Sequence, residues 1–454
     1  MRLKSHAHHL FPVVAFALTT AAFYPGHLSF DSAFQFWQAR TGQYANLSPV
    51  AMTGLWALVH RVWPGSGGVF VLHALFYWAG VWLVACTLFD RPWPRIAAAA
   101  LASVATPAHL VVVHLWTDAA LIAALGFAVA LVLRADATRT RRPLIAALPF
   151  LLYGGLVRHN ALPALVPLVA WWTVAWTKAA PAGPPAQASP MKTAIATAIA
   201  IAAVFGAGRA LDRALVVQRM STFGVVQLWD LTAVSLATGE MLVPDFARPD
   251  GITLDQLRAK MSRYANVPLY APPHALRDGL SDPFTPGESR RLWAAWFGAI
   301  RDHPGVYAAH RLSVASALFG RYRNDRPSDL AFVPFVIGYA DNPTILINDS
   351  ALHGWAVAHY QRAVGWWLYA PVAWIVVALG AAIAGWRLRD DFRGRCALAA
   401  GTSGLLYIAP LPLVAPSTEL RYNGWLFAAA SVAWLALAAY AIARRRGDMR
   451  NADG

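Results

Sequence analysis

The stretch FYPGHLSFDSAFQFWQARTGQY, from Phe23 to Tyr44, decides how the rest of the chain is interpreted. It follows the first long apolar segment directly, and Pro25-Gly26 predicts that the first helix ends where it leaves the bilayer. A second helical pattern begins at once. No A-x-A-like cleavage site lies between the two patterns, so we interpret the first segment as a retained membrane span rather than a signal peptide.

The second helix of this stretch is expected to lie on the membrane surface. Polar side chains recur along it at i, i+4 and i+7 and therefore share one face, namely Asp31, Gln35 and Gln38. Aromatic side chains repeat with the same spacing one residue earlier, namely Phe30, Phe34 and Trp37. A helix with these two faces holds a carboxylate at the lipid boundary. The alternative is that Asp31 merely starts a helix, where the dipole favours acidic residues.

Composition places the chain among integral membrane proteins of the all-α class. Hydrophobic residues make up 57% of it, charged residues 13%, and the mean hydropathy is +0.43. We predict a polytopic helical bundle of about ten spans, with the surface helix after the first span. The predicted spans are residues 10–25, 68–89, 94–114, 116–134, 143–157, 159–177, 193–211, 365–386, 396–414 and 423–443.

The net charge of +15 does not indicate a nucleic-acid partner, because of where the charges lie. Nearly half of the 38 Lys and Arg residues fall in six short segments between or beyond the predicted spans. This is the positive-inside pattern of cytoplasmic loops, and with an even number of spans it puts both termini in the cytoplasm. The two cysteines, Cys86 and Cys396, have no metal-ligand spacing and are expected to be small buried hydrophobes.

The domain organisation follows from these spans and from a Pro/Ala-rich linker, KAAPAGPPAQASPMK. The chain lacks GxGxxG, P-loop, HExxH and CxxC motifs, so ATP, dinucleotide and structural zinc binding have no support. The predicted parts are an N-terminal transmembrane module with its first outer loop (1–177, loop 26–67), the cytoplasmic linker (178–192), one further span (193–211), a large outward-facing and mostly helical insertion (212–364), and the C-terminal spans with a basic tail (365–454).

Polar residues of the kind that perform chemistry collect at the predicted outward ends of the spans. Unpaired charges there cost several kcal/mol, so they are expected to pair or to bind a charged ligand. A guanidinium suits a lipid-linked phosphate, and a nearby carboxylate suits a general base. The residues are Asp31, Gln35 and Gln38 after the first span, His114, Thr117 and Asp118, then Arg158, His159 and Asn160, and finally Glu419, Arg421 and Tyr422.

Each of these residues also has a plain structural interpretation. Asp118 can cap a helix, and Arg158 can simply pair with Asp118. Arg421 can extend to the interface, and His159 can be a satisfied structural histidine. The recurrence of carboxylates and arginines on one side favours the functional interpretation.

Several short motifs together resemble bacterial integral-membrane glycosyltransferases of the GT-C superfamily, of the dolichyl-phosphate-mannose-protein mannosyltransferase type. Arg158-His159-Asn160 resembles their RxN element, Leu420-Arg421-Tyr422 their late RY element, and Trp116-Thr117-Asp118 their second acidic position. Their first outer loop is matched by Tyr24-Pro25-Gly26, Asp31-Ser32, Gln35, Gln38-Ala39, Gly42-x-Tyr44 and Ser48-Pro49.

This resemblance implies a polyprenyl-phosphate-linked sugar donor, a glycan, lipid or protein acceptor, inversion at the sugar carbon, and an active site on the periplasmic face of the bacterial inner membrane. It implies that Asp31 is the catalytic base, that Asp118 assists, and that Arg158 and Arg421 hold the donor phosphate. The remaining substrate-binding candidates are Gln35, Gln38, His159, Asn160 and Tyr422.

Two departures from the family pattern bear on this expectation. The first loop has one acidic residue where some members have an adjacent pair, so a divalent metal is possible but not required. The insertion 212–364 matches no recognised sugar-binding domain. Two alternatives stay open: a flippase or transporter of polyprenyl-linked glycans or lipids, which needs a polar path through the bundle, and a membrane scaffold in which Asp31 is dispensable.

Overall fold

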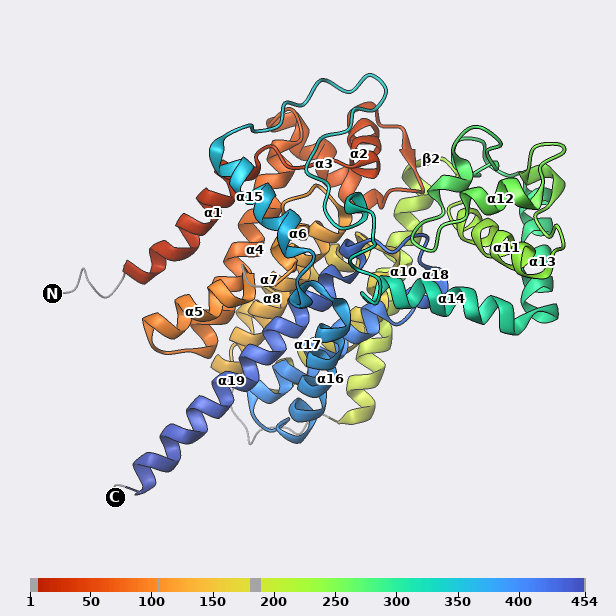
Figure 1. Cartoon of the computed structure of the whole chain (residues 1–454). Coiled ribbons are helices and arrows are strands. Elements are labelled where there is room, and N and C mark those ends of the chain that lie inside the picture. The colour runs from red at the N-terminus through yellow and green to blue at the C-terminus, as the bar shows by residue number, and fades with distance from the viewer. Residues whose placement is uncertain (1–6, 104–105, 180–188, 453–454) are drawn as a thin grey trace.

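The chain folds into a helical bundle with a smaller helical part beside it (Figure 1). The computed structural model describes residues 7–103, 106–179 and 189–452, so most of the predicted linker lies outside the described residues. Strands within the described part are limited to β1 (Tyr44–Ala45) and β2 (Val216–Gln218), which pair in parallel. The prediction of an all-α protein is therefore confirmed.

Every predicted span coincides with a helix, and the third span is divided into two. Proline at position 107 precedes the short second half of that span. The helices are α1 (Leu10–Phe23), α4 (Gly67–Leu88), α5 (Pro92–Ser103), α6 (Ala108–Val112), α7 (Thr117–Thr138), α8 (Arg142–Leu156), α9 (Leu162–Lys178), α10 (Pro190–Leu215), α16 (Pro371–Arg387), α17 (Phe392–Ile408) and α19 (Gly424–Ala452).

Five helical stretches in the described part are long and apolar enough to cross a membrane. They are Gly67–Leu88, Thr117–Thr138, Pro190–Leu215, Phe392–Val414 and Leu420–Gly447. Helix α7 lies at the centre, with 78% of its apolar window buried, whereas the apolar window of α10 is only 6% buried. A long apolar helix that leaves nearly all of its surface uncovered fits a lipid surrounding.

Small residues let the bundle helices approach closely. A Cβ on Gly80 of α4 would lie 3.1 Å from the backbone of Phe127 in α7. A Cβ on Gly385 of α16 would lie 2.4 Å from the backbone nitrogen of Leu398 in α17, which is a clash. Such contacts between small residues are typical of helix packing in membranes, where the hydrophobic effect contributes little to association.

Helix α7 carries a buried aspartate near each end. Asp118 lies in its first turn, and Asp136 lies close to its last. Asp136 pairs with Arg395 at the start of α17 at 2.8 Å and accepts a hydrogen bond from Trp171 at 2.9 Å. Eighteen residues of helix span about 27 Å, close to the ~30 Å of bilayer hydrocarbon. The two buried carboxylates therefore mark the two ends of the bundle.

The first part of the predicted insertion, residues 219–330, forms a lobe with its own core. Its helices are α11 (Gly224–Thr238), α12 (Leu254–Lys260), α13 (Pro286–Asp302) and α14 (Pro304–Leu318), so this part of the insertion is mostly helical, as expected. Capping boxes begin two of them, with Thr253 and Gln256 on α12 and Thr285 and Glu288 on α13. Leu228, Trp229, Leu257, Leu292 and Val314 fill the core.

The second part of the insertion returns over the bundle instead of belonging to the lobe. After residue 330 the chain crosses above α2 and reaches α15 (Ala351–Ala363), which packs against α1 (Figure 1). Nδ1 of His353 lies 3.0 Å from the carbonyl oxygen of Ala22. The predicted single insertion is thus two structural units.

The aromatic face of the first-loop helix is partly covered by protein. This helix is α2 (Phe30–Thr41), followed by α3 (Val50–Val62). Phe34 is buried, and the ring of Tyr339 lies 5.1 Å from it and 5.8 Å from the Trp37 ring. Asn342 donates to the Ala33 carbonyl oxygen at 2.8 Å. The returning segment thus covers part of the face that the sequence pattern assigned to the membrane surface, while Phe30 stays 53% exposed. Amphipathic spacing does not distinguish lipid from protein as the apolar partner.

Candidate functional site

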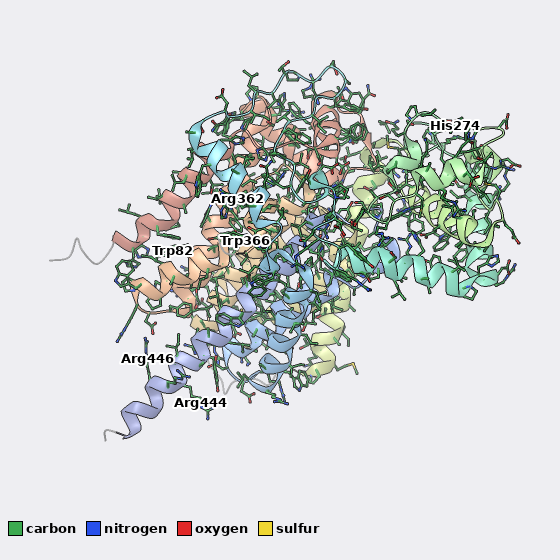
Figure 2. All side chains as sticks on the ribbon, in the orientation of Figure 1. Trp82, His274, Arg362, Trp366, Arg444 and Arg446 are labelled. Carbon is green, nitrogen blue, oxygen red and sulfur yellow. The ribbon has the colours of Figure 1, made fainter. Side chains whose placement is uncertain are left out.

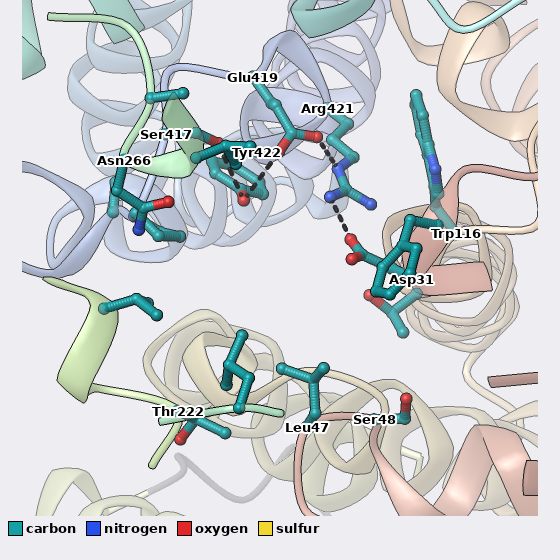
Figure 3. Close-up of a pocket in the computed structure, with 18 of the residues that line it drawn as sticks. Asp31, Leu47, Ser48, Trp116, Thr222, Asn266, Ser417, Glu419, Arg421 and Tyr422 are labelled. Atoms are coloured by element: carbon teal, nitrogen blue, oxygen red, sulfur yellow. Dashed lines mark hydrogen bonds and ion pairs between the residues drawn. The ribbon is translucent and has the colours of Figure 1, made fainter. Parts of the chain in front are cut away.

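A cavity of about 560 Å³ lies at the end of the bundle that carries Asp118, between the bundle and the lobe (Figure 3). Four loops of the bundle and several segments of the lobe contribute to its wall. The polar side chains of the wall include Asp31, Gln35, Thr117, Arg158, Asn160, Glu419, Arg421 and Tyr422 from the bundle and Thr222, Asn266, Tyr270 and Asp278 from the lobe.

Asp31 and Arg421 meet on this wall. Nη2 of Arg421 lies 2.6 Å from Oδ2 of Asp31 and donates a hydrogen bond to it. Asp31 lies in the first turn of α2 with its side chain 56% exposed, whereas Arg421 lies in the 3-10 turn η8 (Leu420–Asn423) with its side chain 8% exposed. The carboxylate therefore reaches the open cavity while the guanidinium forms its floor.

The guanidinium of Arg421 is held in place from several directions. Glu419 contacts its Nε, and the ring of Trp116 lies 4.8 Å from its central carbon. The Tyr422 hydroxyl bonds with Ser417 and Glu419, both at 3.2 Å, so this short turn is tied to itself (Figure 3). Salt bridges and ring stacking of this kind fix the plane of an arginine and leave it pre-organised for a planar or tetrahedral anion.

Arg158 lines the same cavity but is committed to Asp118. Its Nη1 lies 2.5 Å from Oδ2 of Asp118, and its Nε donates to Oδ1 of Asn160 at 3.2 Å. Asp118 is fully buried, accepts from the Tyr407 hydroxyl at 3.2 Å, and is not part of the cavity wall. The structure thus contains the Arg158–Asp118 ion pair that the plain structural interpretation expected. Asp118 lies behind Arg158 and does not reach the cavity.

The two arginines share one aromatic neighbour. The central carbon of Arg158 lies 5.0 Å from the centre of the Tyr422 ring, and that of Arg421 lies 5.5 Å from it. Tyr422 therefore sets the spacing between the two guanidinium groups. Both arginines line the same cavity, as the expectation that they hold one donor phosphate requires.

The glutamines of α2 have different positions. Gln35 lies on the cavity wall and donates to Thr53 at 3.0 Å. Gln38 is fully buried, donates to Ser48 at 2.8 Å and accepts from the backbone nitrogen of Ala45 at 2.6 Å. Gln38 thus fastens the turn that follows α2 and does not line the cavity. The side chain of His159 lies outside the described residues.

The lobe supplies cavity residues that the sequence did not single out. Residues 264–266 run beside 416–418, because Thr418 donates to the Tyr264 carbonyl at 2.7 Å and Asn266 donates from its backbone to Pro416 at 3.3 Å. Asn266 lies across the cavity from Asp31 in Figure 3. Its side chain is buried, and its Nδ2 has no hydrogen-bond partner among the described residues. A buried amide without a partner is costly unless a ligand satisfies it.

Three buried histidines lie behind the site, and the sequence pointed only to His114. His114 stacks on Trp116, with ring centres 3.7 Å apart, and His27 lies 5.2 Å from His114 and 5.3 Å from His353. Burial, reinforced by the neighbouring His353, lowers the pKa of His27 to about 3. His27 is therefore neutral at ordinary pH and acts as packing beneath the aromatic platform of Arg421.

Acidic groups outnumber the arginines at the cavity. Asp31 and Glu419 both contact Arg421, Asp118 neutralises Arg158, and Asp278 adds a further carboxylate on the lobe side. An anionic ligand therefore has to displace one of these carboxylates from its arginine. Within the described part of the chain, no group of three or more His, Cys, Asp or Glu side chains is arranged to hold a metal ion.

Comparisons with protein-family models, with curated proteins and with solved structures found no match to this chain. The fold and the site define an all-helical protein with several candidate membrane spans and a polar, carboxylate- and arginine-lined cavity at one end of its bundle.

Proposed function

We propose that this protein is a membrane glycosyltransferase of the GT-C type, which moves a sugar from a polyprenyl-phosphate donor to a cell-envelope acceptor. The observation that carries the proposal is the contact between Asp31 and Arg421 on the wall of one cavity. The contact places the candidate base, Asp31, beside the candidate phosphate-binding residue, Arg421, and the motif resemblance assigns these roles to them. The proposal includes the bacterial inner membrane as the location.

The proposed topology has ten spans, both termini in the cytoplasm, and the cavity on the periplasmic side. Support comes from the distribution of the loops between the two ends of the bundle. The end of α7 and the start of α17, which border the α7–α8 and α16–α17 loops, pair through Asp136 and Arg395. The α4–α5 loop meets the start of α17 and the end of α19 at a second pocket. These arginine-rich loops lie at the end opposite the cavity, as the positive-inside rule requires.

The proposed reaction uses an exchange of ion-pair partners at Arg421. The donor phosphate takes the place of Asp31 on the guanidinium, which frees the carboxylate beside the sugar. Asp31 then accepts the proton of the acceptor hydroxyl, and the hydroxyl oxygen bonds to the sugar carbon from the face opposite the phosphate. The bond from that carbon to the phosphate oxygen breaks, and its electron pair leaves with the polyprenyl phosphate, stabilised by Arg421.

The lobe wall is the proposed acceptor side. Asn266, with its unpartnered Nδ2, can donate to a hydroxyl or carbonyl oxygen of an acceptor. The lobe is joined to the turn that bears Arg421 by backbone hydrogen bonds and by Arg311, which donates to the Ala415 carbonyl at 3.1 Å. Acceptor binding against the lobe therefore acts directly on the turn that holds the donor phosphate.

The test is reconstitution of the full chain in liposomes with a labelled polyprenyl-phosphate sugar. Transfer of the label to an acceptor supports the proposal, and Asp31→Asn should abolish it. The matched control is Asp341→Asn, because Asp341, like Asp31, pairs with an arginine, namely Arg40 at 3.1 Å, but lies outside the cavity. Movement of the labelled lipid between leaflets without transfer would support the flippase alternative instead.

A further inference from the structure

A second pocket, of about 270 Å³, lies at the opposite end of the bundle from the cavity, and it is basic. Its wall is formed where the turn between α4 and α5 meets the start of α17 and the end of α19. The lining residues are Leu88, Phe89, Asp90, Arg91, Pro94, Arg393, Ala439, Ile442, Ala443, Arg446 and Gly447. This pocket, called the basic pocket below, has no part in the proposed sugar transfer.

Three arginines from three separate segments converge on the basic pocket, against the single lining carboxylate of Asp90. Nε of Arg393 is buried without a hydrogen-bond partner among the described residues. Among the side chains that the structure describes, neither Arg91 nor Arg446 has a carboxylate within 4.0 Å. Arg393 itself is only loosely paired, with its Nη1 3.4 Å from Asp391. Guanidinium donors are thus left available for an anion.

The start of α17, capped by Asp391, forms part of the wall of the basic pocket. Helix α17 begins at Phe392, directly beside Arg393, and the positive end of its dipole lies at this wall. Asp391 caps that helix end by accepting from the backbone nitrogen of Arg393 at 2.7 Å. The guanidinium of Arg393 also lies over the Phe392 ring at 4.4 Å, which orients it. The pocket combines a fixed arginine with two longer-reaching ones, a set that matches the tetrahedral oxygens of a phosphate.

The other half of the wall is apolar. Leu88 and Phe89 are buried, and Ile442 is 40% exposed at the rim. On α19, Ala439, Ala443 and Arg446 are spaced i, i+4 and i+7, so small apolar residues and the arginine share the face that borders the pocket. A pocket that is basic on one side and apolar on the other fits an amphiphile better than a free ion.

We propose that the basic pocket binds the phosphate headgroup of an anionic phospholipid, with the acyl chains along the outside of α19. The pocket is slightly smaller than the ~300–1,000 Å³ sites that enclose whole drug-sized ligands, which suits a headgroup whose chains remain outside. Basic pockets between transmembrane helices on the arginine-rich side are where anionic headgroups bind. This proposal does not rest on the glycosyltransferase proposal.

Neighbouring arginines on the same helix provide a matched control. Arg444 and Arg445 are exposed and do not line the pocket, whereas Arg446 does. Figure 2 labels Arg444 and Arg446, which project from different sides of α19, as expected for residues about 200° apart around a helix. The double variants Arg91→Gln/Arg446→Gln and Arg444→Gln/Arg445→Gln remove the same charge from the same end of the molecule. They should therefore differ in lipid binding only if the arginines that line the pocket bind the headgroup.

The experiment compares the full chain in nanodiscs of phosphatidylcholine with and without phosphatidylglycerol, and counts retained lipid by native mass spectrometry. We expect selective retention of phosphatidylglycerol, lowered about five-fold per arginine in Arg91→Gln/Arg446→Gln and unchanged in Arg444→Gln/Arg445→Gln. Equal losses in both double variants would mean surface charge alone and would overturn the proposal, as would equal retention of both lipids.

A second arm separates lipid from soluble phosphate. Inorganic phosphate and glycerol 3-phosphate are titrated into the phosphatidylcholine nanodiscs, and thermal stability is measured. Stabilisation by phosphatidylglycerol that neither soluble anion reproduces supports the lipid assignment. The proposal would be overturned if millimolar inorganic phosphate stabilised the protein as much as the lipid does and if Arg393→Gln abolished that effect. The basic pocket would then be a site for a free anion.

Discussion

Asp31 and Arg421 are 390 positions apart in the chain, and their side chains are 2.6 Å apart in the fold. The contact joins the first loop of the bundle to the turn before the last helix, so it closes the cavity wall between the two ends of the sequence. Because Arg421 is nearly buried and Asp31 is half-exposed, only the carboxylate can leave the pair without exposing a buried charge. This asymmetry makes Asp31 the mobile partner.

Removal of the Asp31 carboxylate should reduce turnover strongly while the fold persists. We expect Asp31→Asn to lower kcat by about 10²–10⁴-fold, the range for loss of a general base, because the amide cannot accept the acceptor proton. Steady-state transfer in liposomes measures this effect. Retention of more than half of the normal rate in Asp31→Asn would reject the role of base.

Arg421 and Arg158 should respond differently to replacement by lysine. We expect Arg421→Lys to raise the donor KM by about ten-fold or more, since an ammonium offers a point charge in place of a planar set of donors. Arg158→Lys should act mainly on stability, because Arg158 is already bound to Asp118. Donor titrations and thermal melts of both variants separate the roles. An unchanged donor KM in Arg421→Lys would contradict phosphate binding there.

Asn266 should affect the acceptor and leave the donor alone. We expect Asn266→Ala to raise the acceptor KM by about five-fold, the equivalent of one lost hydrogen bond, with kcat and donor KM unchanged. Thr222→Ala is the control, since Thr222 lies on the same lobe wall. A change in donor KM alone would place the donor, and not the acceptor, against the lobe.

The buried His27 should make stability depend on pH in the acidic range. Its pKa is about 3 in the fold and about 6.5 in an unfolded chain, so between these values the unfolded chain binds more protons. His27 therefore contributes no penalty above about pH 6.5, and stability falls as the pH decreases from there toward 3. Melting curves from pH 7 to 4 should show this fall, and His27→Phe should reduce it. An equally steep fall in His27→Phe would assign the effect to other groups.

Replacing one residue of the Asp136–Arg395 ion pair should destabilise the fold more than replacing both. Arg395→Met leaves Asp136 as an uncompensated buried charge, and we expect a cost of about 3–5 kcal/mol in unfolding free energy. Asp136→Leu/Arg395→Met should recover much of that cost, because both charges are gone. Thermal melts in detergent of the two variants provide the measurement. A double variant less stable than the single one would show that the pair is a net source of stability.

Several features of the fold were accessible from sequence because they depend on local patterns. Apolar length predicted the long helices of the bundle, namely α1, α4, α5, α7, α8, α9, α10, α16, α17 and α19. The i, i+4 and i+7 spacing predicted that Asp31 and Gln35 share a face, and both lie on the cavity wall. Gln38 has the same spacing but binds the backbone of the following turn through Ala45. The sequence pattern does not indicate which part of the fold contacts a polar helix face.

Sequence alone determined that the chain is helical and apolar and that its short loops carry an excess of arginine and lysine, because those properties follow from residue type and periodicity. Tertiary structure alone decided that Arg158 is already neutralised by Asp118, that Tyr339 packs on Phe34 of α2, and that Asn266 of the lobe faces Asp31. These relationships join segments tens to hundreds of residues apart. Long-range pairing depends on how helices pack and on where the chain returns, and local periodicity carries no information about either.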